Sequence, residues 1–254
     1  MDFKHISFTD SGMKRNDNQD SIYAFKNDKC AVFVVADGMG GYENGKNASD
    51  TLIKYIAKYI ELDMAKIKDA SKQFDKPYDS NAFFEDMKES LLEANKELFE
   101  NYTAKGHSSG STLIMLAIYD NAYNIFWAGD SHIYQVVDDE LVALTVDDVW
   151  ENDEERTKGL TPEQIKKDSN YGKLTNAFGT VKNVNIHTMS GIPAKGMKFF
   201  LCSDGVYKYS EEEDLKKLIM SEVKDENKFK EEIKSLVYKN GAPDNFSYIY
   251  LELT

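Results

Sequence analysis

The sequence predicts an α+β fold in which antiparallel sheets are covered by helices. Segments typical of strands and segments typical of helices fall into separate blocks along the 254 residues and do not alternate, which favours this class. Strands come first, two helices follow, and further strands lead to two helices and a last strand. We see no internal repeat and no low-complexity linker, so we expect a single domain over residues 1–254.

The first forty residues show the pattern of antiparallel strands. We expect these strands at residues 3–8, 22–25 and 30–36. The segment between the first two strands, from Ser11 to Asp20, is dense in turn residues. It is therefore predicted to be a loop, and it carries Arg15.

Apolar residues at helical spacing then predict two amphipathic helices. The first begins at Ala48 and has apolar positions as far as Ile60. A polar connection around Pro77 separates it from a second helix with apolar positions from Phe83 to Phe99. Both apolar stripes are expected to pack onto a sheet.

The second half of the chain returns to strands and ends with helices. Strands are expected at 111–119, 123–128, 133–137, 140–144, 198–202 and 247–252. A weakly helical piece is expected at 173–178, and amphipathic helices at 211–220 and 227–239. Residues 147–170 carry eight acidic residues and little apolar periodicity. They form either a mobile flap or an ordinary surface excursion.

Composition excludes several classes of function. The formal net charge of −13 argues against nucleic-acid and anionic-membrane partners, because both require basic patches. Cys30 and Cys202 lie in apolar runs and do not indicate a disulfide or zinc framework. We expect no signal peptide, and no apolar run reaches membrane-spanning length. We expect a cytoplasmic monomer.

Three predicted strands end in an aspartate. Asp37 closes one apolar run and is followed by Gly38, Gly40 and Gly41, whose lack of a Cβ lets the backbone approach a ligand closely. Asp204, before Gly205, and Asp130 close two more runs. Asp20, in the first loop, and Asp244, in a turn before the last strand, complete the set. These aspartates are expected to form one acidic cluster.

A cluster of carboxylates without His or Cys indicates a hard cation such as Mg²⁺ or Mn²⁺. Two such ions about 3.5–4 Å apart can hold a phosphate oxygen and lower the pKa of a shared water to about 7. That water could attack phosphorus without a protein nucleophile, while Arg15 grips the phosphate. Each Asp-Gly pair taken alone is more often a simple turn.

The combination and order of the motifs are more informative. They are residues 15–21 (RNDNQDS), 35–41 (VADGMGG), 110–112 (GST), 128–131 (AGDS), 174–179 (LTNAFG), 201–205 (LCSDG) and 244–247 (DNFS). In this order the chain resembles the metal-dependent protein phosphatase family, protein phosphatase 2C, in its compact bacterial form.

The resemblance implies a four-layer sandwich, with two central antiparallel sheets flanked by helices. It also implies hydrolysis of phosphoserine and phosphothreonine in proteins by a water bound at a two-metal Mn²⁺ or Mg²⁺ centre, without a covalent phosphoenzyme. The substrates would be those of a bacterial Ser/Thr kinase. Residues 147–170 would form the flap beside the site.

The resemblance also assigns a role to each site residue. Asp37 would bridge the two central ions and Gly38 would offer its carbonyl to one of them. Asp204 and Asp244 would hold the other. The remaining roles are Asp20 on a metal or its waters, Asp130 with Asp204 at a third ion, and Arg15 on the substrate phosphate.

The chain departs from the family pattern at several positions, which are Gln19, Met39, His132, Asn176 and residues 147–149. His132 is interpreted as a structural substitute for an arginine. Two alternatives to the protein phosphatase stay open: a catalytically silent phosphoprotein-binding regulator, and a phosphatase of small phosphate monoesters or phosphotyrosine.

Overall fold

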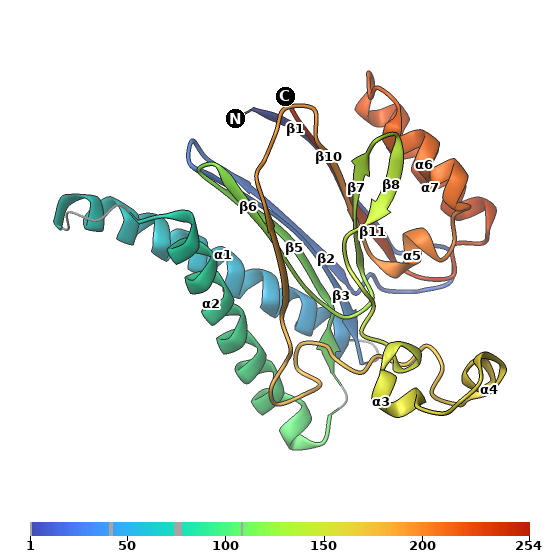
Figure 1. The fold of residues 1–254 in the computed structure, drawn as a ribbon. Helices are drawn as coiled ribbons and strands as arrows, with labels where there is room; N and C mark the ends of the chain where they lie inside the picture. Colours follow the sequence, from blue (N-terminus) through green and yellow to red (C-terminus); the bar gives the residue numbers. More distant parts are fainter. Residues whose placement is uncertain (1, 41–42, 74–77, 108) are drawn as a thin grey trace.

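The computed structural model describes residues 2–40, 43–73, 78–107 and 109–254. Two antiparallel sheets face each other, and helices cover the outer face of each (Figure 1). Helices α1 (Glu43–Gln73) and α2 (Ser80–Asn101) cover one sheet, and α6 (Glu212–Met220) and α7 (Glu226–Lys239) cover the other. The predicted α+β sandwich of four layers is confirmed.

One sheet contains both ends of the chain. Its strand order is β1 (Phe3–Asp10), β11 (Phe246–Leu253), β10 (Lys198–Cys202), β7 (His132–Val137) and β8 (Glu140–Ala143). Strands β1 and β11 pair along their whole length, from Phe3 opposite Leu253 to Asp10 opposite Phe246. The loop after β1 is therefore brought beside the segment that precedes β11.

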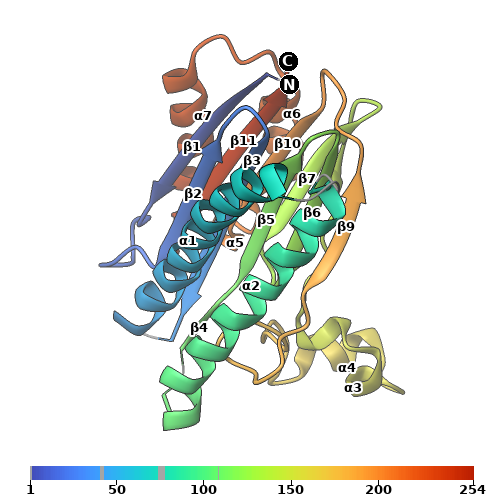
Figure 2. The same cartoon turned by 90° about the vertical axis from the view of Figure 1, so that its left-hand side faces the viewer.

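The other sheet carries the glycine-rich turn. Its order is β2 (Asp20–Lys26), β3 (Cys30–Met39), β5 (Leu113–Tyr119), β6 (Ala122–Ala128) and β9 (His187–Gly191), and β4 (Gly110–Ser111) pairs with the end of β3. Figure 2 shows α1 and α2 side by side across the outer face of this sheet.

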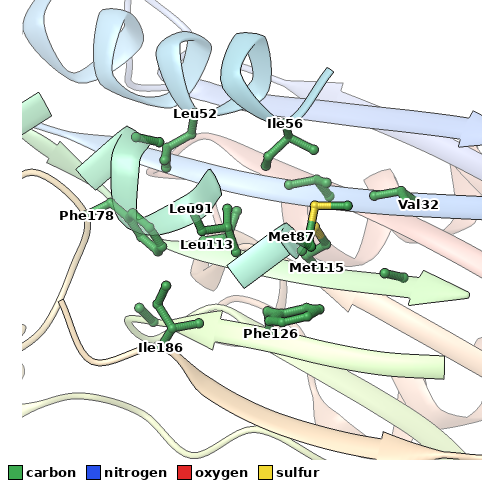
Figure 3. Packing of buried hydrophobic residues seen from close by; sticks show 14 of the residues in the cluster. Val32, Leu52, Ile56, Met87, Leu91, Leu113, Met115, Phe126, Phe178 and Ile186 are labelled. Carbon is green, nitrogen blue, oxygen red and sulfur yellow. The ribbon is translucent and has the colours of Figure 1, made fainter. Parts of the chain in front are cut away.

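The residues of β3 alternate between two apolar cores. Phe33 and Val35 point into the core between the sheets, whereas Val32 and Val34 pack against the helices. Figure 3 shows this second core, where Leu52 and Met87 of the two helices meet the sheet. Because both faces of the strand are buried, its sequence is a continuous apolar run that ends at Ala36.

Several predicted elements differ from those observed. Helix α1 begins at Glu43, not at Ala48. Residues 173–178 are not helical; they form isolated bridges from Phe178 to Ser111 and from Leu174 to Val149. Strand β9 was not predicted, and its exposed pattern explains why. The predicted strand 111–119 is divided at Thr112 into β4 and β5.

Residues 147–170 contain the short elements η2 (Trp150–Asn152), α3 (Glu154–Thr157) and α4 (Pro162–Lys167), which project beyond the sheets (Figure 2).

Pro77 lies outside the described residues. Cys30 and Cys202 are buried free thiols, as expected. Among the helices described, none has the length and apolar character needed to cross a membrane.

Candidate active site

The predicted site residues converge on one cavity of about 710 Å³. Its lining includes six of the seven residues predicted from the sequence: Arg15, Asp37, Gly38, Asp130, Asp204 and Asp244. The aspartates lie at or just beyond the ends of strands from both sheets, because β3, β6, β10 and β11 end or begin at this edge of the sandwich. Residues that are far apart in sequence therefore meet at one edge.

Asp20, the seventh residue, lies beneath the cavity and opposite Asp37 in the β2–β3 ladder. Its side chain is buried, and its Oδ2 accepts a hydrogen bond of 2.8 Å from Ser203 Oγ. Its Oδ1 is buried and has no hydrogen-bond partner among the residues that the structure describes. Burial raises the pKa of Asp20. The orphaned oxygen indicates that a cation or its water ligands belong here.

Asp37 is held rigidly by its backbone. Its N–H donates to Thr112 Oγ1 at 3.1 Å, and its carbonyl accepts from the Thr112 N–H at 2.9 Å. Burial, followed by the charges of Asp20, Asp204, Asp130 and Asp244, raises the pKa of the Asp37 carboxyl well above its usual range. A carboxylate surrounded by four others is stable in its charged form only beside a compensating cation.

Gly38 is required by the packing of the fold, in addition to the role predicted from the sequence. A Cβ at Gly38 would lie 2.2 Å from the carbonyl oxygen of Gly45 and 2.7 Å from that of Gln19. The glycine therefore permits the close approach of β3 to the start of α1. Gly40, with a φ of 124°, continues the turn, and Gly41 lies outside the described residues.

Arg15 occupies the mouth of the cavity and makes a two-pronged ion pair. Its Nε and Nη2 atoms lie 2.9 Å from Asp244 Oδ1 and Oδ2, respectively. The loop that carries Arg15 packs closely under this aspartate, because a Cβ at Gly12 (φ 72°) would lie 2.2 Å from the Asp244 carbonyl oxygen. The guanidinium thus faces the carboxylate cluster.

Asn245 fixes this loop, and the sequence did not predict that role. The buried Asn245 amide donates to the carbonyl oxygens of Ser11 and Asp17 at 3.0 and 2.9 Å and accepts from the Gln19 N–H at 2.9 Å. Asn245 therefore joins the start of β11 to both ends of the Arg15 loop. The only indication in the sequence was that Asn245 follows Asp244 in a predicted turn.

Lys208 was also missed. Its Nζ donates to Asp130 Oδ2 and Asp204 Oδ2, both at 2.8 Å. It lies four residues after Asp204, just past helix α5 (Asp204–Tyr207). In the sequence, that spacing indicates only an ordinary i,i+4 ion pair with Asp204. The contact with Asp130 is apparent only from the fold.

The donor set fits a hard divalent ion, since all the acidic groups supply oxygen. The buried Asp20 and the half-buried Asp37 have no cationic side chain paired with them among the described residues. In the present arrangement, Arg15 holds Asp244, and Lys208 holds Asp130 and Asp204. Over the described residues, no three His, Cys, Asp or Glu side chains are arranged to hold one ion together. Metal binding at Asp244 therefore requires this carboxylate to turn away from Arg15, which contacts both of its oxygens. Asp204 need not leave Lys208, because the ammonium contacts its Oδ2 and its Oδ1 can face an ion.

The departures from the family pattern lie around the cavity and not in its lining, except for Gln19 and Met39. His132 Nε2 lies 2.6 Å from Asp147 Oδ1, and its ring stacks on Tyr207 at 3.9 Å between centroids. Asp148 binds His187 Nε2 at 2.8 Å and Asn176 Nδ2 at 2.7 Å. These pairs anchor the start of segment 147–170 to the two sheets.

The comparisons with known proteins agree with this fold. The family model described as "Protein phosphatase 2C" matches residues 13–242. The serine/threonine phosphatase stp of Listeria innocua is 26% identical over 221 residues, covering 85% of this chain and 83% of that protein.

Two solved structures show the same fold. The serine/threonine phosphatase of S. agalactiae superposes with a TM-score of 0.81 at 22% identity, covering 99% of this chain and 100% of that one. The catalytic domain of the phosphatase PstP, solved with two manganese ions, gives 0.73 at 23% identity, covering 98% and 97%.

The fold and the carboxylate-lined cavity together define a metal-dependent phosphatase. The family model spans most of the described chain, and this protein therefore belongs to the protein phosphatase 2C family.

Proposed function

We propose that this protein hydrolyses phosphoserine and phosphothreonine in proteins, with two divalent ions, Mn²⁺ or Mg²⁺, held in the cavity. The observation that carries the proposal is the Asp37 carboxyl in the cavity lining, whose pKa is raised by desolvation and by the charges of four other aspartates. The names of the Listeria and Streptococcus relatives support the substrate class, and the manganese-bound PstP domain supports the ions.

The carboxylates would divide the ions as the resemblance implies. Asp37 would contact both ions, the Gly38 carbonyl would add a ligand to one, and Asp204 and Asp244 would hold the other. Asp20 would act through its orphaned Oδ1 on an ion or its waters. When bound, such ions neutralise phosphate charge and lower the pKa of water, so that hydroxide is supplied near neutral pH.

Arg15 would position the substrate. Its fork of N–H groups now grips the Asp244 carboxylate in the geometry that suits a phosphate. When Asp244 turns to a cation, the guanidinium is released at the cavity mouth, where its side chain is 56% exposed. Arg15 would then bind two phosphate oxygens and hold the ester over Asp37.

Segment 147–170 would select among substrates, since Gly172, Lys173 and Leu174, which follow it, line the cavity. A phosphoprotein brings its own flanking residues against this rim, whereas a small ester does not. We further propose one domain, a monomeric state and a cytoplasmic location. The resemblance adds that a Ser/Thr kinase supplies the substrates.

The test is hydrolysis of a phosphothreonine peptide and of p-nitrophenyl phosphate, with Mn²⁺, with Mg²⁺ and with EDTA. We expect turnover that needs a metal, is lost in Asp204→Asn and favours the peptide. Preference for the small ester would indicate a phosphatase of small monoesters. A folded protein that binds the ions without turnover of either substrate would indicate a silent phosphoprotein-binding regulator.

A further inference from the structure

The third ion implied by the resemblance does not fit the site of this chain. Its ligands would be Asp130 and Asp204, and the Lys208 ammonium already lies between them. Both N–O distances are 2.8 Å, which is typical of a charge-assisted hydrogen bond. A position that would require a cation is thus filled by a side chain.

We propose that Lys208 replaces the third metal ion, so that this phosphatase works with two divalent ions and one built-in ammonium group. The inference rests on the proposed two-metal function. It concerns only the Asp130 side of the cavity and leaves the ligands of the two central ions as assigned above.

The fold holds Lys208 in this place. The Lys208 N–H donates to the Asp204 carbonyl at 3.0 Å, which fixes its backbone at the end of α5. The Tyr207 hydroxyl donates to the Asp130 carbonyl at 2.8 Å. Helix α5 is thereby tied to both acids. The Asp130 side chain is 8% exposed and that of Lys208 41%, so the ammonium approaches from the solvent side.

The charges favour the ammonium over a third divalent ion. The Lys208 ammonium lies 2.8 Å from an oxygen of each acid, so it places a positive charge between them. Like charges a few ångströms apart repel each other, and a divalent ion is repelled by an ammonium group twice as strongly as a monovalent ion would be. A third ion would therefore enter only if Lys208 swung out of the site.

The overall charge balance agrees. The cluster contains the five carboxylates of Asp20, Asp37, Asp130, Asp204 and Asp244. Two divalent ions and the Lys208 ammonium would neutralise all five. The positive charge of Arg15 would then remain for the substrate phosphate.

The experiment is a count of bound Mn²⁺ per chain by equilibrium dialysis and elemental analysis, at a free Mn²⁺ concentration that saturates the wild type. We expect about two ions in the wild type and about one more in Lys208→Asn. The extra ion should disappear in the double variant Lys208→Asn with Asp130→Asn. Lys217→Asn, which removes an exposed lysine paired with Asp214 on α6, is the matched control and should bind as the wild type does.

Each other outcome decides against the inference in a distinct way. Three ions in the wild type, or no gain in Lys208→Asn, would overturn it while leaving the two-metal function intact. Fewer than two ions in the wild type would overturn the proposed function and this inference with it. If Lys208→Asn does not fold, as judged by circular dichroism, Lys208→Gln provides the same count with a hydrogen-bond donor retained.

Discussion

Asp20 and Asp37 lie directly opposite each other on adjacent antiparallel strands, one beneath the cavity and one in its lining. Their opposition follows from the β2–β3 register, which runs without a bulge from Asp20 and Asp37 to Lys26 and Ala31. Two acids at one rung of a ladder repel each other unless a cation or a proton lies between them. The sheet thus builds an unfavourable pair at the place where the ions are proposed to bind.

Asp37→Asn should have opposite effects on activity and on metal-free stability. Turnover of the phosphothreonine peptide should fall by orders of magnitude, because the carboxylate shared by both ions is lost. In EDTA at pH 7 the variant should unfold at a higher temperature than the wild type. The reason is that a carboxyl whose folded pKa is raised destabilises the fold once the pH exceeds its unfolded pKa.

Asp139→Asn, in the exposed β7–β8 turn, is the control for Asp37→Asn and should change neither quantity. Near-normal turnover of Asp37→Asn with saturating Mn²⁺ would rule out the proposed site.

Gly38→Ala should destabilise the protein by more than about 3 kcal/mol, because the new methyl group would overlap a backbone carbonyl that cannot move cheaply. The measurement is the free energy of unfolding in urea. Gly159→Ala, where a Cβ meets nothing within 4 Å and only the left-handed backbone (φ 82°) opposes it, should cost roughly 1–2 kcal/mol. Equal losses in the two variants would show that the contact with Gly45 is not tight.

Asn245→Ala should loosen the Arg15 loop. The variant removes the side chain that bonds to the Ser11 and Asp17 carbonyls and to the Gln19 N–H, at a cost of about 0.5–1.5 kcal/mol for each part-buried hydrogen bond. We expect KM for the phosphopeptide to rise by a larger factor than kcat falls, since the loop positions substrate. Steady-state kinetics with Mn²⁺ would check this.

Asn240→Ala, which removes one exposed hydrogen bond to the Tyr209 carbonyl, is the control for Asn245→Ala. A fall in kcat at constant KM in Asn245→Ala would contradict the positioning role.

Asp10 should stabilise the fold in a pH-dependent manner. Burial alone would raise its pKa, but hydrogen bonds from Lys234, Gly12 and Tyr238 outweigh burial and lower the pKa below 3.8. A lowered carboxyl pKa gives stability that is complete above the unfolded pKa and is lost as the pH falls through the folded pKa.

The wild type should therefore exceed Asp10→Asn in unfolding free energy at pH 7, and the two should converge as the pH falls below 3.8. Chemical denaturation across this range is the measurement. Asp120→Asn, in an exposed turn, should show no such convergence. A constant gap for Asp10→Asn down to the lowest pH would be inconsistent with the assignment.

The elements that sequence predicted best are those with strong and bounded apolar patterns. The strand β10 was predicted to the residue, because Lys198 and Ser203 bracket an uninterrupted apolar run. Strand β9 escaped notice because it is an edge strand of exposed polar residues whose pairing with β6 is a tertiary event. The error at 173–178 has a similar cause, since Phe178 is positioned by Ser111, far away in the sequence.

In the site, too, the features set by local sequence could be predicted, and those set by tertiary contacts could not. The acids were predictable because each lies at or near the end of a strand, and Asp37, Asp130 and Asp204 are also next to a glycine. Lys208 was not predictable, because its role depends on its ion pair with Asp130. Asp130 lies in the loop between β6 and β7, far from Lys208 in the sequence. The hydrogen bonds of Asn245 to residues far away in the sequence could not be predicted either, because they depend on the pairing of β1 with β11.

The two free cysteines can report the local unfolding of the two helical layers, because each thiol is buried under a different layer. Cys30 belongs to the core under α1 and α2, and Cys202 to the core under α6 and α7. Burial raises the pKa of Cys30 to about 11 and that of Cys202 well above its ordinary value, so neither thiol reacts while it is covered. The rate at which an alkylating reagent labels each sulfur would therefore report the local unfolding of one helical layer independently of the other.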